Sequence, residues 1–183
     1  MKYFNKTQDR SVIFRNRYNE SHIAGLGDKI QSIAQAFGTS ISDFDRNTIL
    51  MQIQPQVSTR KILLVGHSQG TFYTNAIYQY LIKNGVPAES IAVYNLATPA
   101  SYVEGGGKYL TSANDRVING IRPLMGKFGA NMPLTANITI TIPPKEINDK
   151  NGGHHFSSSY LGEEPDRIVS DITSALGGLK AGA

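Results

Sequence analysis

Blocks of hydrophobic and polar residues in the middle of the chain predict a strand, a helix and a second strand in succession. The unbroken apolar run at residues 62–65 is typical of a strand covered on both faces of a parallel sheet. Helical spacing follows directly and stops at Asn84-Gly85, with one face formed by Phe72, Ala76, Ile77, Tyr80 and Leu81. A second apolar run fills residues 91–96. Together these segments predict a right-handed βαβ unit.

Fainter patterns predict the other elements. We expect short strands at 11–14, 109–111 and 136–142, and helices at 23–37, 41–54 and 166–176. The segments 104–108, 121–133 and 148–153 are predicted to be loops. Since no repeat or domain boundary interrupts the pattern, residues 1–183 are predicted to form a single domain of the α/β class.

Composition and charge narrow the classes of function. The net charge of +4 is scattered, with no basic run longer than Arg60-Lys61, which argues against a nucleic-acid partner. The absence of cysteine excludes disulfides, thiolate metal sites and a cysteine nucleophile. We see no secretion signal and no apolar stretch of about 18 residues, so we expect a cytoplasmic protein without a transmembrane segment.

The predicted turn between the first strand of this unit and its helix reads Gly66-His67-Ser68-Gln69-Gly70, which is the pattern G-x-S-x-G. A serine at a tight strand-to-helix corner brings the residues two before and two after it together, so both glycines should be required. The corner would expose the Ser68 hydroxyl and place the Gln69 N–H at a helix N-terminus, where it can stabilise an oxyanion. The alternative is a glycine-rich turn that cradles a phosphate, although the P-loop and dinucleotide patterns are absent.

This motif resembles the nucleophile elbow of the α/β-hydrolase superfamily, which in lipases and esterases often reads G-H-S-x-G. The resemblance runs from about residue 61 to the end. It implies a three-layer sandwich with a mostly parallel central sheet, a serine nucleophile followed along the chain by an acid and then a histidine, and no metal or cofactor. Only about 60 residues precede the elbow strand, so the fold would be a reduced one that lacks early strands of the family.

A serine nucleophile needs a base, and the chain has four histidines: His22, His67, His154 and His155. The implied order selects the pair His154-His155 in a glycine-rich loop, while His67 is expected to point away across the elbow. We favour His154, because small hydrolases with such an elbow often carry His-x-Phe before a Tyr-Leu pair, as Phe156 and Tyr160-Leu161 do here. His155 remains the alternative base.

The favoured acid is Asp115, which follows a predicted strand in an Asp-x-Val turn similar to that of the family. Three competing carboxylates are Asp149, Asp166 and Asp171. The second oxyanion donor should come from the turn after the 11–14 strand, from Asn19 or Glu20, since the His-Gly signature of many relatives is missing.

The sequence therefore predicts a serine hydrolase that cleaves a small-molecule acyl ester, with Ser68 attacking, His154 moving the proton and Asp115 orienting the imidazole. A thioesterase or acyltransferase would use the same three residues. A non-catalytic binding module on the same fold would use none of them, and the missing early strands keep that alternative open.

Overall fold

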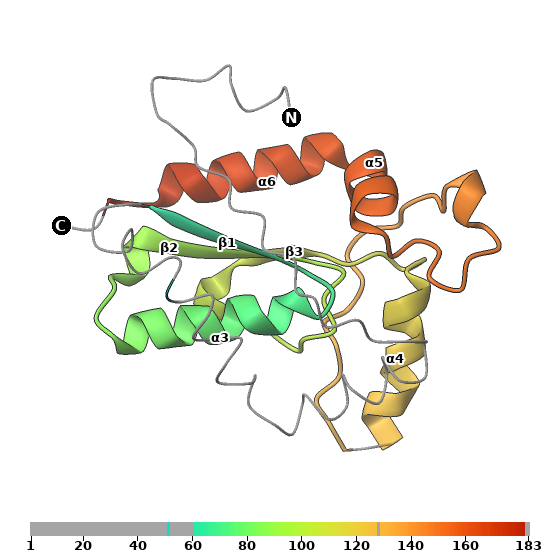
Figure 1. Ribbon diagram of the computed structural model, residues 1–183, viewed down its shortest axis with the longest axis horizontal. Coiled ribbons are helices and arrows are strands. Elements are labelled where there is room, and N and C mark those ends of the chain that lie inside the picture. Colours follow the sequence, from blue (N-terminus) through green and yellow to red (C-terminus); the bar gives the residue numbers. More distant parts are fainter. Residues whose placement is uncertain (1–50, 52–60, 128, 182–183) are drawn as a thin grey trace.

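The computed structural model describes residues 51, 61–127 and 129–181, which form an α/β arrangement (Figure 1). Its strands are β1 (Ile62–His67), β2 (Ile91–Leu96) and β3 (Lys108–Leu110), and its helices are α3 (Gly70–Lys83), α4 (Arg116–Lys127), α5 (Leu161–Glu163) and α6 (Pro165–Gly178). Short helical turns lie at Ala88–Ser90, Glu104–Gly106, Pro144–Glu146 and Phe156–Tyr160. The strand predicted at 11–14, the helices at 23–37 and 41–54 apart from Met51, and the donors Asn19 and Glu20 lie outside the described residues.

The predicted βαβ unit is present. β1 and β2 pair in parallel with Ile62 opposite Ile91 and His67 opposite Leu96, and β3 adds to β2 in parallel, giving the order β1-β2-β3. In Figure 1 the strands run between α6 on one side and α3 on the other. Because the strands are parallel, the segments that leave their carboxyl ends meet at one edge of the sheet.

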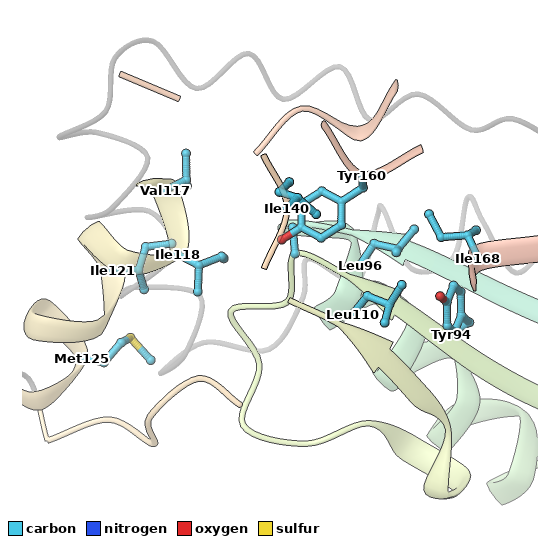
Figure 2. Packing of buried hydrophobic residues seen from close by; sticks show 11 residues of the cluster. Tyr94, Leu96, Leu110, Val117, Ile118, Ile121, Met125, Ile140, Tyr160 and Ile168 are labelled. Carbon is cyan, nitrogen blue, oxygen red and sulfur yellow. The ribbon is translucent and has the colours of Figure 1, made fainter. Parts of the chain in front are cut away.

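Two apolar clusters cover the two faces of this sheet. The smaller one lies under α3 and is centred on Ile77, Leu81 and Ile91. The larger one, shown in Figure 2, joins β2, β3, α4, α6 and the segment after residue 153 through Tyr94, Leu96, Ala97, Leu110, Val117, Ile118, Ile121, Met125, Ile140, Tyr160 and Ile168. Since α4 and the later segments pack into the same cluster, the loops that follow β3 and precede α6 are fixed relative to the sheet.

The segment 121–133, predicted to be a loop, is helical up to Lys127, so that prediction was wrong for its first half. α4 buries Val117, Ile118, Ile121 and Met125 at helical spacing, although Pro123 and two glycines lie inside it. Burial of this face stabilises the helix against its poor intrinsic propensity.

The strand predicted at 136–142 was also wrong, since only Ile138 forms a bridge, to Ser112. Its alternating burial is as expected, with Ile140 buried and Thr139 exposed. Side chains replace much of the ladder: Asn137 Oδ1 accepts the Thr111 N–H at 2.9 Å and Ser112 Oγ accepts the Ile140 N–H at 3.1 Å. Burial thus alternates along this segment as in a strand, although regular strand hydrogen bonding is absent from it.

Two further predictions are confirmed with small shifts in their bounds. The strand expected at 109–111 is β3, and the helix expected at 166–176 is α6, which also includes Gly177 and Gly178. α3 ends as predicted, with Asn84 as its C-cap and Gly85 at a φ of 86°.

Candidate active site

Ser68 lies at the corner between β1 and α3. Its φ of 55° is the left-handed conformation that a residue with a Cβ rarely adopts. Two hydrogen bonds hold the backbone at this corner. The Ser68 N–H donates to the Leu96 carbonyl at 3.0 Å, and the Thr71 hydroxyl donates to the Ser68 carbonyl at 2.8 Å. The strained backbone is thus held by the neighbouring strand and by the first turn of α3.

The two glycines of the motif are not equivalent. A Cβ added at Gly66 would lie 2.9 Å from Asn95 Oδ1, from the Gly70 carbonyl oxygen and from Thr71 Cα, so no side chain fits there. A Cβ added at Gly70 would meet nothing within 4 Å. The expectation that both positions must lack a side chain is therefore wrong for Gly70, because only Gly66 faces the elbow.

The structure brings Ser68, His154 and Asp115 together from three distant stretches of chain. Ser68 Oγ lies 2.9 Å from His154 Nε2, and His154 Nδ1 lies 2.9 and 3.0 Å from the two Asp115 oxygens. Because a carboxylate only accepts, Nδ1 carries the proton and Nε2 is left to accept the Ser68 hydroxyl. The His154 side chain is 12% exposed and that of Asp115 is 0% exposed. This arrangement can remove the serine proton when a substrate approaches.

Asp115 is held by α4 as well as by the histidine. Its Oδ1 accepts the Ile118 N–H at 3.0 Å, which is the bond of a helix N-cap, and the Asn119 N–H begins the helix by donating to the Asp115 carbonyl at 3.0 Å. Its Oδ2 accepts the Tyr160 hydroxyl at 2.8 Å. The carboxylate is thus a buried charge whose oxygens are hydrogen-bonded, as such a group requires.

The loop that carries His154 is tied down by Glu146, which is 4% exposed. Its carboxylate accepts the Gly153 N–H at 3.1 Å, the Ser159 hydroxyl at 2.6 Å and the Ser158 hydroxyl. Burial alone would raise the pKa of Glu146, but these three hydrogen bonds outweigh it and the pKa lies below its ordinary value. The ionised Glu146 carboxylate therefore binds the loop both before His154, at Gly153, and after it, at Ser158 and Ser159.

Glycine at 153 lets this loop approach the acid. Gly153 has a φ of 78°, and a Cβ there would lie 2.6 Å from the carbonyl oxygen of Asn114, the residue before Asp115. The glycine therefore sets the close approach of the His154 and Asp115 segments.

The other candidates lie in separate contacts. His155 Nε2 pairs with Asp149 Oδ2 at 2.7 Å, in a half-exposed pair. Asp171 binds Lys108 at 2.8 Å and ties α6 to β3. Asp166 is exposed in the first turn of α6. None of the three competing carboxylates is a hydrogen-bond partner of His154 among the described residues.

His67 does not point away from the site, as had been expected. Its Nε2–H donates to the His154 carbonyl at 2.8 Å, and the two rings lie 5.0 Å apart. Burial, together with the neighbouring His154, lowers the pKa of His67 to about 4. The side chain is therefore a neutral donor that anchors the backbone of the histidine loop.

Gln69 is the N-cap of α3, so its backbone N–H lies at the positive end of that helix. None of the described residues accepts this N–H. It is therefore available to one negative oxygen beside Ser68.

Sequence reasoning missed three residues that support the site: His67, Glu146 and Tyr160. His67 lies next to Ser68, and Tyr160 belongs to the Tyr-Leu pair used to choose the base, so both were visible as motif members without a role. No pattern singles out Glu146, because its partners follow twelve and thirteen residues later, a separation that no regular element imposes.

Comparison of the chain with protein-family models, with curated proteins and with solved structures gives no match. Among the described residues, no helix combines the length and the apolar character needed to cross a bilayer. The same part of the chain contains no group of three or more side chains able to hold a metal ion.

Proposed function

We propose that the chain is a serine hydrolase of the α/β-hydrolase type, with a reduced central sheet, that cleaves carboxylic esters. The observation that carries the proposal is the relay from Ser68 through His154 to Asp115, with neighbouring atoms at 2.9 Å from one another. Supporting it are the strained serine backbone and the N–H of Gln69 at a helix N-terminus.

In the proposed reaction the Ser68 oxygen attacks the ester carbonyl while its proton passes to His154 Nε2. Asp115 stabilises the imidazolium and keeps its Nδ1–H pointed at the carboxylate. The Gln69 N–H donates to the developing oxyanion. His154 then returns the proton to the leaving alcohol, and water repeats the sequence on the acyl-enzyme.

A fluorophosphonate probe tests the nucleophile directly. We expect labelling of the wild type and no labelling of Ser68→Ala, whereas Ser170→Ala, an exposed serine on α6, should label like the wild type. Equal labelling of Ser68→Ala and wild type would show that another residue reacts.

Hydrolysis of p-nitrophenyl acetate tests the base. His154→Ala should lose turnover, while the neighbouring His155→Ala should retain most of it, because His155 is paired with Asp149 instead. A background rate equal in wild type and His154→Ala would favour a non-catalytic binding module.

The acyl acceptor and chain length are the finer part of this proposal. A thioesterase or an acyltransferase would use the same proton relay as an esterase. These activities therefore differ in their substrates and not in the geometry of this site. A panel of acyl esters of increasing length, run beside the matching acyl-CoA thioesters, decides between them by the ratio of kcat/KM values.

A further inference from the structure

Tyr160 links the loop of the base to the segment of the acid. It ends the helical turn Phe156–Tyr160 that follows His154, and it is 0% exposed within the main apolar cluster (Figure 2). Its hydroxyl lies 2.8 Å from Asp115 Oδ2 and 2.9 Å from the Ser112 backbone nitrogen. One side chain therefore contacts the triad acid and the strand end that carries it.

The direction of the Tyr160 hydroxyl proton follows from these two partners. The Ser112 N–H can only donate, so the phenol oxygen accepts there, and the phenol proton goes to the Asp115 carboxylate, which can only accept. Burial, reinforced by the Asp115 charge, raises the pKa of Tyr160, so the phenol stays protonated over the pH range in which activity would be measured. Asp115 Oδ2 thus accepts two donors, the phenol and His154 Nδ1.

A carboxylate shares its charge among its donors. Each donor on Oδ2 lowers the negative charge that the His154 imidazolium experiences, and this effect is large where water is excluded. We propose that Tyr160 is a positioning residue that tunes the base, by holding Asp115 against His154 while weakening the carboxylate's pull on the imidazolium. This inference rests on the proposed hydrolase activity for its kinetic meaning but not for its geometry.

Other titratable groups surround the pair, and among the described residues their hydrogen-bond partners do not include the Tyr160 hydroxyl. His67 approaches from β1, with its ring 5.0 Å from that of His154 and 6.1 Å from that of Tyr160. The remaining groups are held by separate partners: Glu146 by Gly153, Ser158 and Ser159, the pair His155-Asp149, and Arg116 by the carbonyls of Ile147 and Asp149. Removing the Tyr160 hydroxyl therefore breaks two bonds, to Asp115 and to the Ser112 N–H, whereas changing the acidity of the phenol keeps both bonds and alters their strength.

The chain supplies a matched control in Tyr94. This residue is 1% exposed, lies in the same apolar cluster, and donates its hydroxyl proton at 3.4 Å to Oδ2 of Asp171, a carboxylate that is not bonded to His154. Tyr94→Phe and Tyr160→Phe each remove one buried hydroxyl that donates to a carboxylate, and Tyr160→Phe also removes the acceptor of the Ser112 N–H. A merely structural role predicts the same kind of loss in both variants.

The test compares the wild type with Tyr160→Phe and Tyr94→Phe in two measurements. In Tyr160→Phe the acidic limb of the kcat/KM profile should move to higher pH, and the downfield NMR signal of the proton between His154 Nδ1 and Asp115 should move further downfield. Tyr94→Phe should leave both unchanged. Tyr160→3-fluorotyrosine, a stronger donor of nearly the same size, should move both in the opposite direction.

Two results would overturn the inference: shifts in Tyr160→Phe no larger than in Tyr94→Phe, or shifts of the same sign in the phenylalanine and fluorotyrosine variants. If Tyr160→Phe fails to fold, the fluorotyrosine variant alone carries the test, since it keeps the hydroxyl. The NMR signal does not depend on turnover. A shifted signal in a protein without esterase activity would therefore reject the proposed function and leave this inference standing.

Discussion

Replacing Gly66 by alanine tests the packing of the elbow most directly, because Gly70→Ala provides a control four residues away. At Gly66 the new methyl group would lie 2.9 Å from three heavy atoms, two of them backbone. The third, Asn95 Oδ1, is itself fixed by the Thr74 hydroxyl at 2.7 Å and cannot swing away without losing that bond. The neighbours must therefore move.

Overpacking of this kind costs about 1 to 3 kcal/mol. Gly70 begins α3, and a Cβ there meets no atom within 4 Å. Alanine at this position should instead stabilise the fold by about 0.4 to 1 kcal/mol, because it reduces the conformational entropy of the unfolded chain. The two alanine variants should thus differ by roughly 1.4 to 4 kcal/mol. Each kcal/mol changes the Tm of a chain of this size by about 2 to 4 °C.

Urea unfolding gives the free-energy difference, and the rate of fluorophosphonate labelling reports the position of Ser68. A displacement of the nucleophile of about 1 Å should slow the reaction by roughly 100-fold in Gly66→Ala and leave Gly70→Ala near the wild-type rate. If the two variants were equally stable and equally reactive, the close approach at Gly66 would not exist in the protein.

Three further predictions concern ionisable side chains. Glu146→Gln should lower the free energy of unfolding by roughly 1 to 3 kcal/mol in urea, because an amide cannot accept all three donors, while Asp166→Asn, an exposed carboxylate in the first turn of α6, should cost less than about 1 kcal/mol. His67, neutral in the folded state, should make the wild type lose about 3 kcal/mol as the pH falls from 6.5 to 4, since the unfolded chain binds that proton more readily; His67→Gln should lose less over the same range. Asp115→Asn should reduce kcat by about 10⁴-fold through the wrong imidazole tautomer, and should lower the free energy of unfolding by roughly 1 to 3 kcal/mol, because asparagine can still cap α4 but cannot accept all three donors; a kcat near that of the wild type would contradict the role of the carboxylate.

The βαβ unit and the elbow could be predicted because their signals are local. The apolar run of β1, the glycine before the serine and the periodicity of α3 are contiguous in the sequence, so the pattern can be recognised without knowing the β2 pairing that completes it. The helix α4 was missed, since residues 121–133 were predicted to be a loop, and the helix contains Pro123. Its buried residues nonetheless follow helical spacing, so the apolar pattern was the better guide.

The choice between His154 and His155 shows where sequence reasoning stops. The two residues are chemically identical neighbours, and their roles diverge only because the positive φ of Gly153 places the first against Asp115 while Asp149 engages the second. Glu146 acts across an irregular loop whose path depends on packing against Asn114. Such contacts are set by tertiary structure and produce no periodic pattern in the amino-acid sequence.

The cap bond from Asp115 to the first turn of α4 gives that position two separate reasons to carry an oxygen acceptor. A related chain without catalytic activity would still gain from keeping Asp, Asn or Ser there. An acceptor at this site in a newly sequenced relative is therefore poor evidence of an active enzyme. Within the described part of the chain the His154 imidazole bonds to the Ser68 and Asp115 side chains and not to the backbone of a helix end, so its presence or loss is the more informative character.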